Sequence, residues 1–381
     1  MDETMRLLVI SNYRDTLNAV RPEGSLFLVL KKWGVDVRVM SWPHLADGQT
    51  PTPFMEQFRR ADIPVIPYHP TRKLSWMAVR RIRRALLTFR PHILHTFNSK
   101  AISNGNFASL GLPVKVLAYR GVIGGLDWWN PNAYLKHLHP RVDAVTAVSK
   151  AVQRDVERQI WWTNGKVYQF YKGQNPAWYA DVRPADLNAL GIPDGAMVVT
   201  CVANNRRWKG LRYLVDAFRH LPPEWPVHLL LIGRNMNETD LDQRIRHSPF
   251  CRRIHRLGHR TDVPAWLAAS DVYVQPSLAD KEGLGKGILE AMTLGIPPMV
   301  TDTGGPAELV RPNQSGYLVP PADEHAIATV LRQCYEQPAR SKQIGQQAKR
   351  DILERFSVEA SARQLLTIYE RVLAGKRSRE E

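Results

Sequence analysis

The chain has 381 residues, of which 44% are hydrophobic and 23% are charged. This length favours two domains over one, and the composition is that of a globular protein, not of a disordered or fibrous one. The three cysteines, at positions 201, 251 and 334, are widely spaced and odd in number, which argues against a disulfide or zinc framework.

Much of the formal net charge of +16 lies in one part of the sequence. No acidic residue occurs between Asp62 and Asp127, whereas lysine and arginine are frequent there. Such a segment attracts polyanions, which include anionic lipids, nucleic acids and phosphorylated substrates. No apolar stretch approaches the ~20 residues that a membrane-spanning helix needs, and the N-terminus lacks a signal-peptide pattern. We therefore expect a cytoplasmic protein, peripheral on the inner face of the cell membrane.

The first half of the chain alternates strand-like and helix-like segments. Residues 6–11 form a strong strand candidate, the apolar run 25–33 predicts a helix that Gly34 ends, and residues 35–40 alternate like a second strand. This order predicts a parallel sheet. The helix expected at 74–89 has arginines on one side, and it either lies on an anionic membrane or only packs its apolar side on the sheet. Further strands are expected at 64–67, 92–95, 115–119, 144–148 and 167–170.

The second half repeats this alternation after a polar, proline-containing stretch, 177–194, that is typical of a linker. The pattern predicts a second α/β domain with its own parallel sheet. Strands are expected at 197–202, 227–232, 255–257, 272–275, 296–300 and 316–319. Helices are expected near 211–220, 240–247, 264–269, 324–336, 341–355 and 358–374.

A glycine-rich stretch between two acids, Glu282 and Glu290, is the strongest functional signal. A helix that begins near Gly285 has free amides in its first turn, and these amides and the helix dipole favour a bound anion. The nearby carboxylates are suited to accept hydrogen bonds from sugar hydroxyls. The alternative is that Glu290 is an ordinary exposed residue near a helix start.

A basic loop, residues 204–210, follows a predicted strand at the position where α/β sheets bind ligands. Arg206 or Arg207, together with Lys209, is suited to hold a diphosphate through charge-assisted hydrogen bonds. The alternative is a solvated basic loop. An Asp-x-Asp pattern at 240–242 resembles a metal–diphosphate motif, but its place at a predicted helix start explains it by helix capping.

These motifs resemble those of retaining glycosyltransferases of the GT-B fold, family 4, also called glycosyl transferases group 1. Residues 282–290 reproduce the E-x7-E pattern of that family, and Lys209 with Gly210 matches its phosphate-binding Lys-Gly. The sequence GYLVPP at 316–321 matches the element that usually follows. The resemblance covers nearly the whole chain and is densest in the second half.

The resemblance implies an α/β protein with two Rossmann-like domains whose parallel sheets face each other across a cleft. Residues 1–180 are then expected to bind the acceptor, and residues 181–357 are expected to bind the nucleotide sugar. Residues 358–381 are expected to contain a helix that packs back on the first domain.

The resemblance also implies roles for individual residues. Glu282, Lys209 and Arg120 are the expected catalytic residues. Glu290 is expected to bind ribose hydroxyls, and neither a metal nor another cofactor is expected. The expected donor-binding residues are Arg206, Arg207, Gly283, Leu284, Gly285, Lys286, Glu290, Arg260 and Gly24.

The chain departs from the family pattern at three positions. Asn204 stands where an arginine is usual, and Gly24 is the only glycine left in a first loop that usually contains two. Arg120 follows a strand where most members have histidine. An arginine there cannot act as a base, but it can hold a sugar or phosphate oxygen.

The predicted activity is transfer of a hexose-type sugar from a UDP- or GDP-sugar to a glycan or lipid-linked acceptor, in lipopolysaccharide or surface polysaccharide biosynthesis. An anionic membrane surface is a further expected partner. The alternatives are a sugar-nucleotide epimerase or a phosphorylase on the same fold. A basic nucleic-acid-binding protein is a remote alternative, because the basic segment has no recognisable nucleic-acid-binding motif. No nucleic-acid partner is therefore expected.

Overall fold

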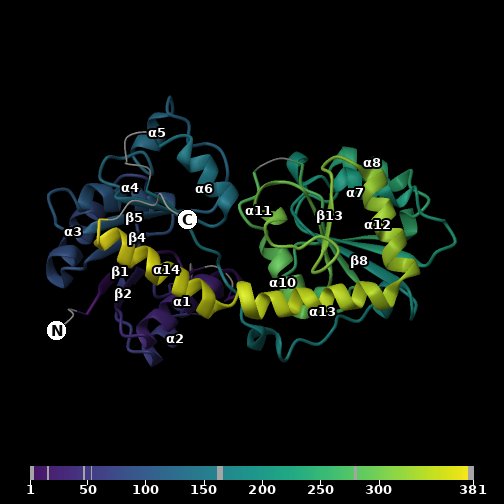
Figure 1. Ribbon diagram of the computed structural model, residues 1–381, viewed down its shortest axis with the longest axis horizontal. Helices are drawn as coiled ribbons and strands as arrows, with labels where there is room; N and C mark the ends of the chain where they lie inside the picture. Colours follow the sequence, from purple (N-terminus) through teal and green to yellow (C-terminus); the bar gives the residue numbers. More distant parts are fainter. Residues whose placement is uncertain are drawn as a thin grey trace. The chain divides into compact units, whose positions relative to one another are not determined.

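The structure is a computed structural model that describes residues 4–14, 17–45, 48–52, 54–160, 166–278 and 281–375. The chain forms two compact α/β units (Figure 1). One unit contains Met1–Gly173 and Val358–Glu381, and the other contains Gln174–Ser357. The chain leaves the first unit at Gly173, before the predicted boundary at residue 180. In the described part, no helix is both long and apolar enough to cross a membrane.

The first unit is built on a seven-stranded parallel sheet with the order β3-β2-β1-β4-β5-β6-β7. Its strands are β1 (Arg6–Ile10), β2 (Asp36–Ser41), β3 (Val65–Pro67), β4 (Ile93–Thr96), β5 (Lys115–Arg120), β6 (Ala144–Ala147) and β7 (Val167–Gln169). Its helices are α1 (Leu17–Lys32), α2 (Met55–Arg60), α3 (Trp76–Phe89), α4 (Ser99–Ala108), α5 (Pro131–Tyr134), α6 (Lys150–Glu157) and α14 (Val358–Leu373).

The second unit contains a six-stranded parallel sheet with the order β10-β9-β8-β11-β12-β13. Its strands are β8 (Met197–Val202), β9 (Val227–Ile232), β10 (Ile254–Gly258), β11 (Val272–Gln275), β12 (Pro298–Thr301) and β13 (Tyr317–Val319). Its α-helices are α7 (Leu211–Phe218), α8 (Thr239–Arg246), α9 (Val263–Ala268), α10 (Lys286–Leu294), α11 (Gly304–Ala307), α12 (Glu324–Glu336) and α13 (Pro338–Arg355). Its 3-10 helices are η1 (Pro176–Tyr179), η2 (Asn188–Leu190), η3 (Arg207–Lys209) and η4 (Cys251–Arg253).

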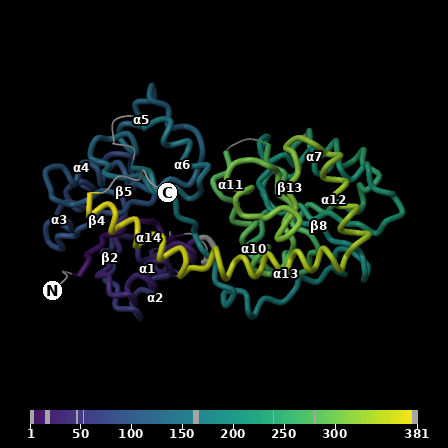
Figure 2. The backbone as a smooth tube through the Cα atoms, viewed as in Figure 1, coloured from purple at the N-terminus to yellow at the C-terminus, as the bar shows by residue number. Residues whose placement is uncertain are grey.

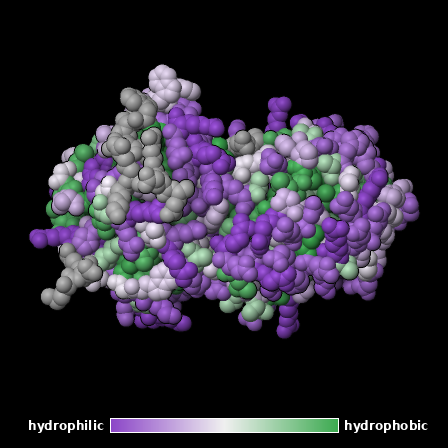
Figure 3. Space-filling model, in the orientation of Figure 1, coloured by the Kyte–Doolittle hydropathy of each residue, from purple (hydrophilic) through white to green (hydrophobic). Residues whose placement is uncertain are grey.

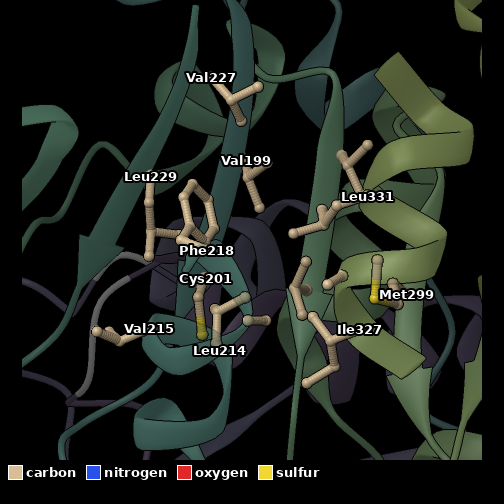
Figure 4. Close-up of a cluster of buried hydrophobic side chains, with 14 of the residues drawn as sticks. Val199, Cys201, Leu214, Val215, Phe218, Val227, Leu229, Met299, Ile327 and Leu331 are labelled. Carbon is tan, nitrogen blue, oxygen red and sulfur yellow. The ribbon is translucent and has the colours of Figure 1, made fainter. Parts of the chain in front are cut away.

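Two parallel sheets with helical connections confirm the predicted fold class. Strands β4, β6, β9 and β11 are short and buried along their whole length, because helices cover both faces of such a sheet. In the second unit, Phe218 of α7 and Leu331 of α12 pack with Val199 and Cys201 of β8 on one face of the sheet (Figure 4). The apolar runs that predicted strands are thus the centre of each core.

The start of α1 differs from the prediction, and the difference changes the interpretation of Gly24. The helix begins at Leu17, not at residue 25, so Gly24 lies within α1 and not in a loop before it. A Cβ atom at Gly24 would lie 2.3 Å from the ring of Phe54. Close packing of Phe54 on α1 therefore accounts for this glycine without a donor contact.

The final helix, α14, completes the first unit from the far end of the chain (Figure 2). It packs against α1. The hydroxyl of Tyr369 lies 2.7 Å from Nδ1 of His95 on β4, and the other ring nitrogen of His95 lies 2.8 Å from the hydroxyl of Thr146 on β6. His95 is fully buried, and this burial lowers its pKa to about 3.

Because the pKa of His95 is lower in the folded state than in the unfolded state, acid favours unfolding. We expect the free energy of unfolding to fall as the pH drops from about 6.5 toward 3, since the unfolded chain then binds more protons. His95→Gln should reduce this fall between pH 7 and pH 5 by about 2 kcal/mol, measured by urea unfolding. His259→Gln, which changes an exposed histidine, should keep the wild-type pH dependence. Identical pH dependence in both variants would contradict this account.

Candidate functional site

The loops that follow β8 and β11 meet at one edge of the second sheet. The two strands are parallel neighbours, so their carboxyl ends lie side by side, where α/β sheets bind ligands. Lys209 comes from the loop after β8 and Glu282 from the loop after β11. Lys209 Nζ forms an ion pair with Glu282 Oε1, and the side chains are only 21% and 13% exposed. The structure thus brings two predicted catalytic residues into contact.

Close backbone contacts hold these two loops together. The amide of Leu278 donates to the carbonyl oxygen of Trp208 over 2.7 Å. A Cβ atom at Gly210 would lie 1.8 Å from the carbonyl oxygen of Pro276, and Gly210 has a φ of +68°. Any other residue at position 210 would push the two loops apart and distort the backbone. The glycine of the Lys-Gly motif is therefore required by packing at this edge.

The loop after β12 supports the glycine-rich stretch in the same way. The amide of Gly305 donates to the carbonyl oxygen of Glu282 over 3.3 Å. A Cβ atom at Gly305 would lie 1.8 Å from the carbonyl oxygen of Gly283. Leu284 is 8% exposed and anchors the same turn. Glu282 is therefore held by its neighbours on both sides.

Helix α10 begins directly after this turn. Gly285, its N-cap, has a φ of +93° and leaves the first helical amides without a side-chain cap. Such an N-terminus favours an anion. Glu290 lies further along α10 and is 4% exposed, with Lys286 Nζ 3.2 Å from its Oε1. The alternative of an exposed glutamate is thus wrong.

The burial of Glu290 has an electrostatic consequence. Desolvation raises its pKa above the ordinary glutamate value, and the ammonium group of Lys286 opposes this rise. A buried carboxylate is costly unless its oxygens accept hydrogen bonds. Glu290 is therefore suited to accept hydrogen bonds from a ligand.

Arg206 and Arg207 are both exposed at the start of the basic loop. The guanidinium group of Arg206 lies 5.1 Å from the ring centroid of Trp208, and the ammonium group of Lys281 lies 5.5 Å from the same ring. Trp208 thus holds a cation from each of the two loops. Lys281 was not predicted, although its place one residue before Glu282 was a usable signal. Within the described residues, Arg206 and Arg207 form no ion pair.

A pocket of about 500 Å³ lies beside this edge, at the carboxyl ends of β9 and β10. The segment after β9 was missed by sequence reasoning, although a glycine followed by polar residues after a strand is a signal for a ligand loop. Asn204 Oδ1 accepts a hydrogen bond of 2.9 Å from the amide of Arg234, which gives this departure from the family pattern a structural role. The pocket is lined by Gly233, Arg234, Asn235, Met236, Asn237, Glu238, Arg256, Gly258 and His259.

Arg260, predicted to bind the donor, does not line this pocket. Its Nε and Nη2 donate to the carboxylate of Asp262 over 2.8 and 2.6 Å, and its guanidinium group lies 5.3 Å from the ring centroid of Trp266. These hydrogen bonds lower the pKa of Asp262. Arg260 is thus held against the start of α9, and its neighbours Gly258 and His259 face the pocket instead.

The two carboxylates of the Asp-x-Asp pattern also form ion pairs. Asp240 lies 3.3 Å from Arg244, and Asp242 lies 2.8 Å from Arg246 and also pairs with Arg256. Both acids therefore have arginine partners in and beside α8.

Arg120 lies in the first unit, at the carboxyl end of β5, and is 8% exposed. Its Nε donates to the carbonyl oxygen of Val122 over 2.9 Å, and its Nη2 donates to that of Gly124. The amide of Gly124 in turn donates to Asp155 over 2.9 Å. Arg120 therefore shapes the loop that follows its own strand, and a catalytic role for it stays a prediction.

Comparison with known families agrees with these motifs. The chain matches the family Glycosyl transferases group 1 over residues 182–351 and Glycosyltransferase Family 4 over residues 26–177. The first match contains every residue of the second unit that is described above as part of the site.

Two curated relatives align with part of the chain. N-acetyl-alpha-D-glucosaminyl L-malate synthase of Bacillus anthracis is 29% identical over 232 residues, which are 61% of this chain and 60% of that protein. The lipopolysaccharide core biosynthesis mannosyltransferase LpsB of Rhizobium meliloti is 27% identical over 195 residues, which are 49% of this chain and 54% of that protein. The aligned parts thus span little more than half of these relatives' length.

Solved structures share the fold of the whole chain. Anabaena HepE, crystallised with UDP and glucose, superposes with a TM-score of 0.72 at 21% identity, and the alignment covers 97% of this chain and 99% of HepE. At this identity the likeness concerns the fold alone. Given the two α/β units and the matches over both of them, the chain belongs to the glycosyl transferases group 1 and has the GT-B fold.

Proposed function

We propose that the protein is a retaining glycosyltransferase that moves a hexose-type sugar from a UDP- or GDP-sugar to a glycan or lipid-linked acceptor. The observation that carries this proposal is the buried Glu290 in α10, on the same sheet edge as the Lys209–Glu282 ion pair. The mannosyltransferase relative and the UDP-bound neighbour are consistent with this activity. The relative, which is named for lipopolysaccharide core biosynthesis, supports a role in lipopolysaccharide or surface polysaccharide biosynthesis.

In this proposal, the second unit binds the donor. The pocket after β9 and β10 is large enough for part of a nucleotide, and Glu290 accepts hydrogen bonds from ribose hydroxyls. The free amides at the start of α10 face the diphosphate. The first unit then binds the acceptor, and Arg120 contributes by holding the loop after β5.

Charge stabilisation carries most of the catalysis. As the bond between the sugar and the diphosphate breaks, negative charge grows on the departing phosphate oxygen. Lys209, with Arg206 or Arg207, neutralises that charge, so the reaction as proposed needs no metal ion. The acceptor hydroxyl attacks from the same face, its proton passes to the departing phosphate oxygen, and the anomeric configuration is retained. Glu282 orients Lys209 and accepts hydrogen bonds from the donor sugar.

Lys209→Ala and Glu290→Gln test the site. Each should lower kcat/KM for transfer by at least about 100-fold, because each removes a group that binds developing charge or the donor. Product formation with a panel of nucleotide sugars and glycan acceptors is the measurement. The exposed-site controls Lys342→Ala and Glu336→Gln should keep wild-type activity. Wild-type turnover in both site variants would refute the site. Donor isomerisation without acceptor would identify an epimerase, and dependence on inorganic phosphate a phosphorylase.

A membrane surface is the second partner that we propose, and α3 is the contact. The inner side of α3 packs Val79, Ile82 and Leu86 into the core. Its outer side exposes Trp76 by 76% and Met77 by 60%. Hydrophobic and hydrophilic residues lie next to each other at the surface in this part of the molecule (Figure 3).

The arginines on the outer side of α3 differ in their contacts with the rest of the protein. Arg83 donates to two backbone carbonyls, and Arg81 lies over the ring of Tyr68. Arg80 and Arg84 are exposed and have no hydrogen bond or ion pair within the described residues. They stand with Trp76 and Leu87 along a groove of about 660 Å³. Free cations beside apolar side chains suit the boundary between anionic headgroups and acyl chains.

Arg80→Glu/Arg84→Glu tests this surface by vesicle sedimentation. Wild-type binding should rise with the fraction of anionic lipid and fall with salt, and the double variant should bind more than tenfold more weakly, since each arginine near such a surface contributes about 1 kcal/mol. Arg252→Glu/Lys342→Glu, at two exposed sites in the second unit, is the charge-matched control. Equal binding to anionic and neutral vesicles would contradict the proposal, and stronger binding to DNA would favour the nucleic-acid alternative.

A further inference from the structure

A second cluster of reactive side chains lies where α7 and α12 meet, away from the residues described above. The two helices pack against each other on one face of the second sheet. His220 follows the end of α7, whereas Glu324 and His325 form the first turn of α12. The N-cap of α12 is Asp323, whose side chain accepts a 2.8 Å hydrogen bond from the amide of Ala326. This cap fixes the turn that presents Glu324 and His325.

The ligand atoms of these three side chains converge. One ring nitrogen of each histidine and one carboxylate oxygen of Glu324 all lie within 4.8 Å of one another. The two imidazole rings are 4.1 Å apart at their centroids. His220 and Glu324 are half-buried and His325 is exposed. Within the described residues, none of the three side chains forms a hydrogen bond or an ion pair.

The chemistry of this set is that of a transition-metal site. Two imidazoles and one carboxylate are ligands that Zn²⁺ prefers, and a water molecule completes a tetrahedral shell. Two atoms bound to one Zn²⁺ at about 2.0–2.1 Å are at most about 4 Å apart. Small side-chain rotations would therefore bring these ligand atoms, now within 4.8 Å of one another, to bonding distance from one ion. Mg²⁺ and Ca²⁺ prefer shells made only of oxygen, which this cluster does not supply.

We propose that His220, Glu324 and His325 bind a zinc-class divalent cation that links α7 to α12. The loop before α7 contains Lys209, so the ion would stabilise the helix that follows the donor-binding loop. Arg332 donates to the backbone carbonyl of His220, which holds this segment in place and leaves the imidazole free for the ion. The ion takes no part in sugar transfer.

Co²⁺ and Zn²⁺ are the probes, with untagged protein that has been treated with a chelator. Co²⁺ bound in a tetrahedral site gives strong visible absorption, and Zn²⁺ bound only by the folded state should raise the Tm, whereas Mg²⁺ should not. Both effects should weaken from pH 7.5 to pH 5.5, because protonated imidazole cannot bind a metal. Neither readout requires glycosyltransferase activity, so a wrong activity assignment would leave the result unchanged.

Single variants identify the ligands. His220→Ala, His325→Ala and Glu324→Gln should each weaken Zn²⁺ affinity by more than about tenfold, since even groups outside the first coordination shell contribute that much. His255→Ala is the matched control, because His255 pairs with His228 over 3.0 Å but the described part of the chain offers this pair no third ligand. Cys251→Ser excludes binding to the exposed thiol.

The results of these variants decide whether the three side chains bind the metal. If His220→Ala does not fold, the exposed His325 still provides the test. Loss of Co²⁺ absorption in the ligand variants, with their metal-free Tm unchanged, would support the site. Retained binding in His220→Ala/His325→Ala, or equal stabilisation by Mg²⁺, would overturn it.

Discussion

The candidate site depends on backbone contacts that only glycine permits. Gly210 and Gly305 bring the loops after β8, β11 and β12 into direct main-chain contact. These contacts hold Glu282 beside Lys209 and place the turn at Gly285 that starts α10. A pair of opposite charges that is mostly shielded from water is effective only when its geometry is fixed, because the desolvation cost is paid in any case. Main-chain packing supplies that geometry.

Hydrophobic patterning was sufficient to predict the two sheets. Each expected strand is present, because strands of a parallel sheet are buried on both faces and appear as short apolar runs. The contact between Lys209 and Glu282 was also predictable from the sequence, because both residues follow strands, and the carboxyl ends of parallel strands lie at one edge of the sheet. The motifs could not predict the burial of Glu290. The sequence around it was as compatible with an exposed position on a helix as with the buried position that it occupies.

The failures have a common cause, which is competition from partners distant in sequence. Helix α4 was missed because its sequence is polar, but its Asn104 is buried and donates to the backbone carbonyls of Arg72 and Lys73. Gly24 was assigned to a loop because Phe54, the residue that requires it, lies far along the chain. Local pattern indicates which residues are able to react, and tertiary contacts decide which ones remain available.

The position of α14 has a consequence for how the protein is made. The second unit is one continuous segment, 174–357, whereas the first unit needs the helix at the very end of the chain. Leu365 and Tyr369 are fully buried, and Tyr369 reaches His95 in the middle of the first sheet. During synthesis the second unit can therefore fold before the first unit has its last helix. The first unit cannot complete its core until α14, which packs against α1, has been synthesised.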